Sequence, residues 1–355
     1  MGHDAFLVAR KGMEALGLLH VREGITYPQG VETGHPYWDG DPTCIWPTEA
    51  LLSLAGVHGV TADRAKDAFR REVPTKPPHV GQPLQLRSLS TWRGRKRITG
   101  KPLRYDPEEP EARRLANQIV DLNAYAATFN VTGCVPPRWF RIFHLNWLLG
   151  GRWYAAGEDA YQSMSEADRV GRIRINGEPV VEVDAKASQL TILHGQCRLT
   201  LPEHDLYTIR DDLPRSAVKA WSTITQGKGY PADEWTDDTR AEDRAVDPQA
   251  IRDAMLAKYS FLNSLELIVP EELTATYGRP QRLVSLYLQW IEAQAITAAM
   301  GYVRSRGHLA LPMHDGLIVA QSAERWAIEG LEGGYEAWAN VTPRLDVERG
   351  DRQPS

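Results

Sequence analysis

Two apolar runs that flank a short polar tip constrain the fold of this 355-residue chain more than any other feature. The runs are residues 309–313 and 317–320, and His314, Asp315 and Gly316 lie between them. Short apolar runs joined through Asp-Gly favour two antiparallel strands with a tight turn. Asp315 then has two interpretations: it forms the turn, or it holds a ligand together with a second carboxylate.

A second carboxylate stands at the end of another apolar strand. Residues 173–183 contain an alternating segment, an Asn176-Gly177 turn pair and an apolar run that stops at Asp184. Residues 185–193 then favour a helix that packs back on the sheet. The order predicted here is strand, turn, strand and carboxylate.

A helix with two cations on one face lies between these carboxylates in the sequence. Residues 213–229 have Pro214 near the expected first turn and glycines near the expected end. On a 3.6-residue period, the expected polar face comprises Arg215, Lys219, Ser222 and Gln226. Arg215 and Lys219 are one turn apart, so both can face the same polyanion.

Two aspartates that meet at neighbouring strand ends repel each other unless a cation lies between them. A pair of Mg²⁺ ions about 3.5–4 Å apart serves this purpose in phosphoryl-transfer sites, with Mn²⁺ as an alternative. One ion lowers the pKa of an attacking hydroxyl, and the other binds a triphosphate and its departing pyrophosphate. Arg215 and Lys219 would face the remaining negative charge, and Lys219 can also donate a proton, because its pKa is lower than that of Arg.

Three segments, in this order, resemble motifs A, B and C of the family-A DNA polymerases and the related single-subunit phage-type RNA polymerases. "VEVDAKASQL" is similar to motif A, "RSAVKAWST" to motif B and "PMHDGLIV" to motif C. "HDLYTI", "QWIEAQAITAAM" and "GGRWYAAGEDAYQ" resemble segments that accompany these motifs. The resemblance spans roughly residues 150–322 and depends on the order of the motifs.

The resemblance implies a role for each matching residue. Asp184, Asp315 and Lys219 would be catalytic. Asp184, Asp315 and the backbone carbonyl of Ala185 would bind metal. The implied nucleotide contacts are Arg215, Lys219, Gln189 and Thr223, and the implied primer or template contacts are His314, Arg152 and Gln289.

The chain departs from the family pattern near the incoming base. Thr223 stands where the family has an aromatic residue or Met, and Gly227 stands where it has Tyr. Base selection must therefore differ here. Gln189 stands where the DNA polymerases have a bulky side chain and the RNA polymerases a small one, which favours dNTPs, although its amide can also donate a hydrogen bond.

The fold implied is α+β: a right-hand polymerase with an antiparallel palm sheet, helical fingers and a reduced, mostly helical N-terminal or thumb region. The expected domains are residues 1–130 (N-terminal, thumb-like), 131–200 (palm, motif A), 201–285 (fingers, motif B) and 286–355 (palm, motif C, and C-terminal tail). Within the first, helices are expected at residues 5–19, 47–56 and 61–72.

A basic segment lies within the N-terminal region. No acidic residue occurs between Glu72 and Asp106, whereas Lys and Arg recur there, among them Arg93, Arg95 and Arg97. A Pro-rich stretch precedes them. We expect an extended arm, residues 73–105, which either contacts nucleic-acid phosphates or is a solvated basic loop.

Composition excludes several other classes. No apolar run approaches the roughly 18 residues of a membrane span, and the N-terminus lacks a signal-peptide pattern, so a cytoplasmic location is expected. Cys44, Cys134 and Cys197 are far apart, which argues against a disulfide framework and a thiolate zinc site. The net charge of −5 argues weakly against a wholly basic nucleic-acid binder.

The expected function is template-directed nucleotidyl transfer to a 3′ hydroxyl by a small DNA polymerase of the kind that a phage, plasmid or mobile element carries. Its expected partners are a DNA primer-template, nucleoside triphosphates and replication proteins of such an element. Three alternatives stay open: a single-subunit RNA polymerase or primase, a palm domain that only binds nucleic acid, and a metal phosphohydrolase. The last is disfavoured because His194 and His204 are poorly placed as ligands.

Overall fold

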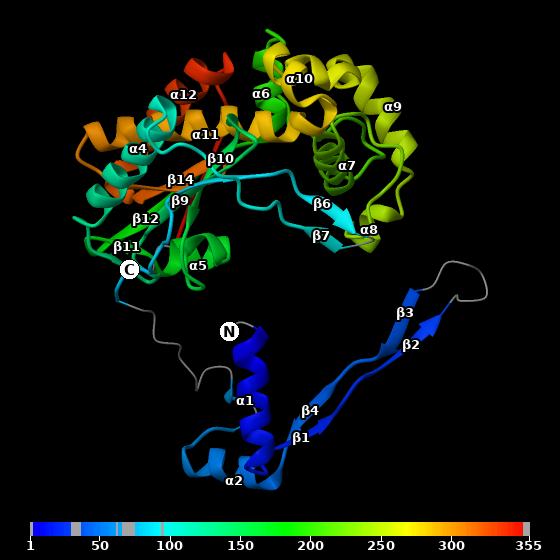
Figure 1. Cartoon of the computed structure of the whole chain (residues 1–355), viewed down its shortest axis with the longest axis vertical. Helices are drawn as coiled ribbons and strands as arrows, with labels where there is room; N and C mark the ends of the chain where they lie inside the picture. The colour runs from blue at the N-terminus through cyan, green and yellow to red at the C-terminus, as the bar shows by residue number, and fades with distance from the viewer. Residues whose placement is uncertain (1–2, 30–36, 62, 66–74, 94–95, 351–355) are drawn as a thin grey trace. The chain divides into compact units, whose positions relative to one another are not determined.

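The computed structural model describes residues 3–29, 37–61, 63–65, 75–93 and 96–350. The chain divides into two compact units, Met1–Glu72 and Val73–Ser355. Figure 1 labels the elements of both units.

The first unit combines helices with short antiparallel strands. Its elements are α1 (His3–Ala15), β1 (Leu19–Arg22), β2 (Ile25–Gln29), β3 (Tyr37–Asp41), β4 (Cys44–Pro47) and α2 (Glu49–Val57). Strand β1 pairs with β4, and β2 pairs with β3. The expectation of a mostly helical N-terminal region is wrong here, because the chain from Leu19 to Arg22 alternates between less and more exposed side chains, which is the period of a strand. The helix expected at residues 61–72 lies largely outside the described residues.

The basic segment contributes strands to the second unit. It contains β5 (Leu84–Arg87), β6 (Thr91–Arg93) and β7 (Lys96–Ile98), and β6 pairs with β7. Strand β5 runs parallel to β9 (Trp139–His144), which pairs in turn with β10 (Asn146–Ala155). Part of the expected arm is therefore an edge strand of a three-stranded sheet.

A larger sheet has β12 (Glu178–Ala185) as its central strand. The other strands are β8 (Val131–Thr132), β11 (Arg174–Ile175), β13 (Ala310–Met313), β14 (Gly316–Ala320) and β15 (Leu345–Arg349). Strand β14 pairs with β12 along one edge and β15 along the other, both antiparallel. The predicted hairpin of residues 309–320 is present, and so is the predicted turn pair, in which Asn176 and Gly177 have φ values of 52° and 84°.

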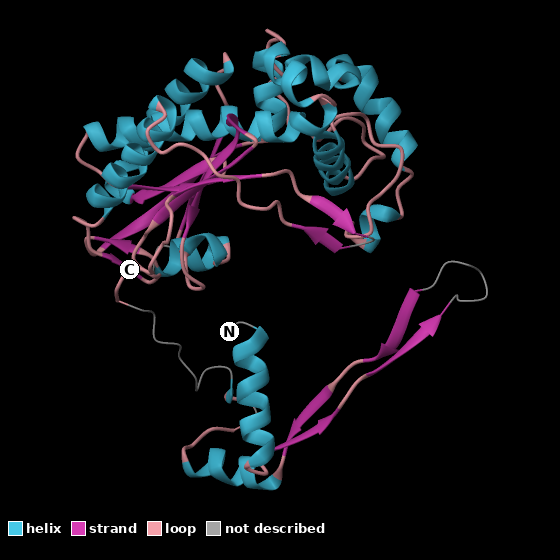
Figure 2. Ribbon diagram, in the orientation of Figure 1, coloured by secondary structure: helices cyan, strands magenta, loops and turns pink. Residues whose placement is uncertain are grey.

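The second unit also contains helices, and some of them cover the two faces of this sheet. They are α4 (Pro110–Ala126), α5 (Glu166–Arg172), α6 (Ser188–Gln196), α7 (Arg215–Lys228), α8 (Ala241–Arg244), α9 (Pro248–Lys258), α10 (Glu271–Tyr277), α11 (Gln281–Ser305) and α12 (Glu324–Ala339). Single 3₁₀ segments lie at Tyr161–Ser163, Ser260–Ile268 and Gln321–Ala323. Figure 2 shows α11 and α12 over one face and α5 against the other. The expected mixture of helices and antiparallel strands is confirmed at this level, whereas the right-hand arrangement stays a prediction.

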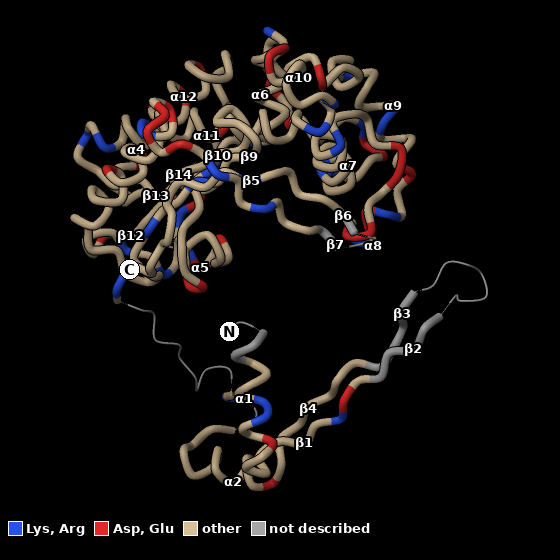
Figure 3. Tube along the Cα trace, viewed as in Figure 1, with Lys and Arg blue, Asp and Glu red and all other residues tan. Residues whose placement is uncertain are grey.

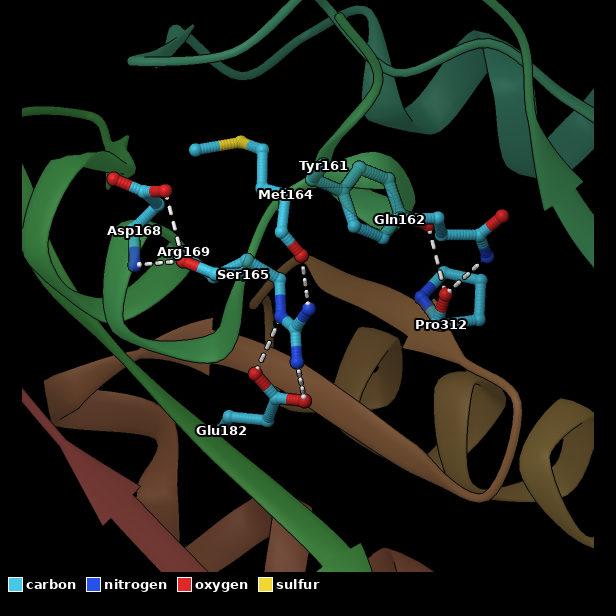
Figure 4. A network of polar contacts seen from close by, with 8 residues as sticks. All are labelled: Tyr161, Gln162, Met164, Ser165, Asp168, Arg169, Glu182 and Pro312. Atoms are coloured by element: carbon cyan, nitrogen blue, oxygen red, sulfur yellow. Dashed lines mark hydrogen bonds and ion pairs between the residues drawn. The ribbon is translucent and has the colours of Figure 1, made fainter. Parts of the chain in front are cut away.

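A buried ion pair fixes α5 against β12. Arg169 donates from Nε and Nη2 to the two carboxylate oxygens of Glu182, each at 2.7 Å, and from Nη1 to the carbonyl of Met164 (Figure 4). In the same region Tyr161 and Gln162 both donate to the carbonyl of Pro312. These contacts link the 3₁₀ segment and α5 to β12 and β13, the strands that lead to the two aspartates.

Gly316 is required by strand packing and not by the turn. The turn residues are His314 and Asp315, because Met313 pairs directly with Gly316. A Cβ on Gly316 would lie 2.5 Å from the carbonyl oxygen of Val183 and 2.7 Å from Cβ of Asp184. The expectation that Asp-Gly forms the turn is therefore wrong by one residue, since the glycine instead allows β14 to approach β12.

We predict that Gly316→Ala destabilises the second unit by about 1–3 kcal/mol, because the added methyl must push two strand backbones apart. The matched control is Gly301→Ala in α11, where a Cβ meets nothing within 4 Å and the substitution should be neutral or slightly stabilising. Denaturant unfolding of both variants measures the difference. Equal free energies of unfolding would contradict the close approach at Gly316.

Candidate active site

Asp184 and Asp315 lie at the same end of the larger sheet. The register partner of Asp184 on β14 is Gly316, the residue that follows Asp315. The backbone N–H of Ala185 donates a 3.0 Å hydrogen bond to the carbonyl of Asp315. Directly opposed residues of antiparallel strands have Cα atoms about 4.5–5.5 Å apart, so the two carboxylates belong to one small region.

A third carboxylate is the neighbour of Asp184 on the other edge of β12. Asp346 of β15 is its register partner there, and directly opposed residues point to the same face of a sheet. Nζ of Lys186 lies 3.3 Å from the carboxylate of Asp346, so that carboxylate has a cation beside it. Asp184 thus lies between two neighbouring chain segments, one that carries Asp315 and one that carries Asp346.

The pKa of Asp184 reflects this concentration of negative charge. Burial, and then the charges of Asp315, Glu182 and Asp346, raise the pKa of Asp184 to about 7. Within the described residues no group of three or more His, Cys, Asp or Glu side chains is arranged to hold a metal ion. Metal binding by Asp184, Asp315 and the carbonyl of Ala185 therefore stays a prediction.

Arg152 reaches the site from β10 and is held by a buried glutamate. Its Nε lies 2.7 Å and its Nη2 2.5 Å from one carboxylate oxygen of Glu292, on α11. The other carboxylate oxygen accepts a 2.6 Å hydrogen bond from Ser188, whose hydroxyl lies 2.8 Å from that of Tyr335. Burial lowers the pKa of the Arg152 guanidinium, but the net shift is upward, because the negative charge of Glu292 and its hydrogen bond raise the pKa. Asp315 is close enough to Arg152 to add to this increase.

His314 lies at the exposed tip of the hairpin. Its ring packs edge-on against Tyr154 of β10, with centroids 5.9 Å apart. Desolvation and the neighbouring Arg152 guanidinium lower the pKa of His314, which favours the neutral imidazole. The hairpin tip and β10 therefore meet beside Asp315.

Helix α7 has exposed cations near its start, and Figure 3 shows that Lys and Arg residues occur along this helix. Arg215, Lys219 and Thr223 are exposed at four-residue intervals. The expectation that Ser222 and Gln226 share that face is wrong: both are buried and hydrogen-bond each other at 3.1 Å. Adjacent residues of a helix are rotated by about 100° from each other, so Ser222 lies on a different side from Thr223. Trp221, Ser222 and Thr225 belong to the side of α7 that packs on the core.

A cavity of about 560 Å³ opens beside Lys186 and Ala187, and it is also lined by Arg215 at the start of α7, by α12 and by residues 343–345 and 347. Lys186, Arg215 and Arg344 supply its positive charges, and Asp205 and Glu332 its negative ones. Arg215 forms a 2.6 Å ion pair with Asp205 and lies over the ring of Tyr207. Ala187, which also lines the cavity, has the left-handed φ and ψ of 50° and 43°, a conformation that is costly for a residue other than glycine.

The remaining residues that were expected to contact nucleotide or nucleic acid lie on several different elements. Gln189 is half-buried in the first turn of α6, and Gln289 is part-buried and hydrogen-bonds Ser285 within α11. Arg93 and Arg97 belong to the paired strands β6 and β7, and their side chains, like all of Arg95, lie outside the described parts of the chain.

Several residues of the site were not expected from the sequence. Ser188, Glu292 and Tyr335 form the hydrogen-bonded chain behind Arg152, and Lys186 and Asp346 form the ion pair beside Asp184. One signal existed for Glu292: it is the single charge in the otherwise apolar stretch "WIEAQAITAAM". A charge on the buried face of a helix indicates a buried partner.

Comparison with known proteins adds a distant likeness. No family model and no curated protein matches the chain. Among solved structures it is similar to the POL domain of Pol1 from M. smegmatis, in complex with DNA primer-template and dNTP, with a TM-score of 0.42 and 14% identity. The match covers 68% of this chain and 51% of that one, so the chain spans about half the length of the matched protein. None of the described helices has the length and apolar character needed to cross a membrane.

We predict that Asp184→Asn stabilises the metal-free protein, and that it does so more at pH 8 than at pH 5. The pKa of Asp184 is raised from 3.8 to about 7, so ionisation of this carboxyl in the folded protein costs stability, and the cost grows as pH rises from 3.8 to about 7. Thermal unfolding in a chelator at both pH values measures this. Asp212→Asn is the control, because Asp212 is exposed and paired with Arg210. The same stabilisation by Asp184→Asn at pH 5 and pH 8 would contradict the assigned charge state.

Proposed function

We propose that the chain is a template-directed nucleotidyltransferase, a small family-A-like DNA polymerase that extends a 3′ hydroxyl. The observation that carries the proposal is the meeting of Asp184 and Asp315 at one end of an antiparallel sheet. In support, a cavity opens beside the segment that follows Asp184, and its charged lining comprises Lys186, Arg215 and Arg344 together with Asp205 and Glu332. At 14% identity the likeness to a solved polymerase domain adds nothing to this argument about activity.

The donor set fits Mg²⁺. Asp184 lies among negative charges that raise its pKa, and a divalent cation would remove that cost. Asp184, Asp315 and the carbonyl of Ala185 are the groups that would hold it, and Mn²⁺ suits the same oxygen donors. Bound there, the metal would supply activation of the 3′ hydroxyl and charge for the phosphate oxygens.

The residues of α7 would bind and position the triphosphate. Arg215 presents several N–H donors to phosphate oxygens, and its ion pair with Asp205 is exposed enough to be exchanged at a cost of up to about 1 kcal/mol. Lys219, one turn further along the same exposed face, holds a proton on Nζ for the departing pyrophosphate. Thr223 leaves the next turn without a large side chain, so the base would stack less tightly there.

Primer extension with Mg²⁺, run in parallel with dNTPs and rNTPs, tests the proposal. The wild type should extend a recessed 3′ end on a template, and Asp184→Asn and Asp315→Asn should each reduce extension by about 10²-fold or more, because each removes a carboxylate that the transition state requires. Asp212→Asn should extend as the wild type does.

Two results would contradict it. Undiminished extension by Asp184→Asn would separate the activity from this site. A wild type that binds primer-template but extends it with neither kind of nucleotide would favour a palm domain that only binds nucleic acid.

The second candidate is a single-subunit RNA polymerase or primase, and Gln189 discriminates between the two. Its half-buried side chain in the first turn of α6 is bulky enough to obstruct a ribose 2′ hydroxyl. We predict that Gln189→Gly raises rNTP incorporation relative to dNTP by about ten-fold or more. Gln189→Glu, which keeps the bulk, should retain the wild-type preference. A wild type that uses rNTPs and ignores dNTPs would replace the DNA polymerase proposal with the RNA polymerase one.

A further inference from the structure

Arg152 and Glu292 form an ion pair with one buried and one accessible partner. The side chain of Glu292 is 1% exposed and that of Arg152 is 20% exposed. Glu292 occupies the Nε and Nη2 donors of the guanidinium, both through the same oxygen atom. Nη1 of Arg152 has no hydrogen-bond acceptor among the described residues. It is also absent from the buried polar atoms that lack a partner, so it is not fully buried. The pair therefore leaves one donor group of Arg152 for a ligand.

The hydrogen bonds behind Glu292 have one consistent direction. Glu292 accepts from Arg152 on one oxygen and from the hydroxyl of Ser188 on the other. Because Ser188 has a single proton and gives it to Glu292, the hydroxyl of Tyr335 must donate to Ser188. The charge of Glu292 is thus satisfied from both sides, and the position of its carboxylate is fixed by three elements, α6, α11 and α12.

Arg152 lies beside Asp315, one of the two catalytic carboxylates of the proposed reaction. Asp315 and Tyr154 both influence the guanidinium electrostatically, and Arg152 in turn influences His314. Ser188 begins α6, four residues after Asp184 and one before Gln189. The series of hydrogen bonds from Tyr335 through Ser188 and Glu292 to Arg152 therefore connects the interior of the helical layer to the tip of the hairpin that carries Asp315.

The Arg169–Glu182 pair provides a structural comparison within the same chain. There both side chains are nearly buried, and Arg169 uses Nε, Nη1 and Nη2 for protein acceptors. Each guanidinium nitrogen of Arg169 thus has a protein acceptor, and the pair holds α5 on β12. Arg152 differs because its third nitrogen and part of its surface remain available.

We propose that Glu292, supported by Ser188 and Tyr335, is a positioning residue that orients Arg152 Nη1 toward the duplex at the primer end. A fixed guanidinium loses little conformational entropy on binding, whereas a free arginine side chain would have to be ordered each time. This inference rests on the proposed function, since the ligand is the primer-template of that reaction. It adds that affinity for the primer-template depends on a buried acid that never contacts DNA.

The test is the affinity for DNA, measured by fluorescence anisotropy at one fixed salt concentration without nucleotides. The probes are a recessed-end primer-template and a single strand of the same length. Arg152→Ala and Glu292→Gln should each weaken binding of the primer-template by about ten-fold, the size expected for a hydrogen bond to a charged group. Their double variant should be little weaker than either, because both remove the same contact. Single-strand affinity should stay unchanged.

Milder variants keep the test valid if Glu292→Gln fails to fold. Ser188→Ala and Tyr335→Phe should weaken primer-template binding by about two-fold or more while retaining the wild-type unfolding temperature within a few degrees. The matched control is Tyr302→Phe, which removes a 2.6 Å hydrogen bond to Glu329 between the same two helices, α11 and α12, and should leave affinity unchanged.

The possible failures are distinguishable. Wild-type affinity in folded Glu292→Gln, Ser188→Ala and Tyr335→Phe, additive losses in the double variant, or equal losses for single strands would each overturn the inference while leaving extension intact. A wild type that binds primer-template and responds to Glu292→Gln but extends nothing would support the inference and overturn the polymerase activity. A wild type without affinity for primer-template would overturn both.

Discussion

Repulsion among carboxylates at one end of β12 is the constraint on which the rest of the second unit depends. The strand is paired on both edges, so Asp184 cannot move away from the segments that carry Asp315 and Asp346. Gly316 brings β14 closer than any other residue would allow, and the Arg169–Glu182 pair holds the opposite side of the strand. The fold therefore maintains an unfavourable charge arrangement, which is typical of sites where a cation or a substrate later supplies the missing interaction.

The buried side of the site shows the opposite arrangement, because each charge there has a partner. Glu292 is surrounded by donors, and burial still raises its pKa to about 7. A buried ion pair of this kind contributes little net stability, since the cost of desolvation offsets most of the attraction. Its value lies in orientation: a guanidinium held from behind presents a fixed direction to whatever lies in front.

The sequence predicted those parts of the site that depend on local signals. Asp184 and Asp315 follow apolar runs, Asn176-Gly177 is a strong turn pair, and the periodicity of α7 placed Arg215 and Lys219 on its exposed face. Two wrong predictions also concerned local features. The turn at the hairpin tip was predicted one residue too late, and the exposed face of α7 was predicted to include Ser222 and Gln226, which are buried. The strands of the first unit were missed because their alternation is short and partly exposed.

Ser188, Tyr335 and Asp346 could not be found in this way. Each matters only through a residue more than a hundred positions away, and no local pattern reports the pairing of β12 with β15 or the packing of α12 on α6. The roles of individual residues in binding nucleotide or DNA likewise depend on a ligand, so the sequence supplies them as expectations alone.

The pairing of β12 with β15 has a consequence for biosynthesis. As the chain leaves the ribosome, β12 emerges directly after β11, but β14 and β15, which pair with most of its length, follow only after α6, α7 and α11 have been made. Until then the buried part of β12, from Val180 onward, has two open edges, the condition under which nascent chains associate wrongly. The helices synthesised in between would have to shield it, so the candidate site would be among the last parts of the molecule to form.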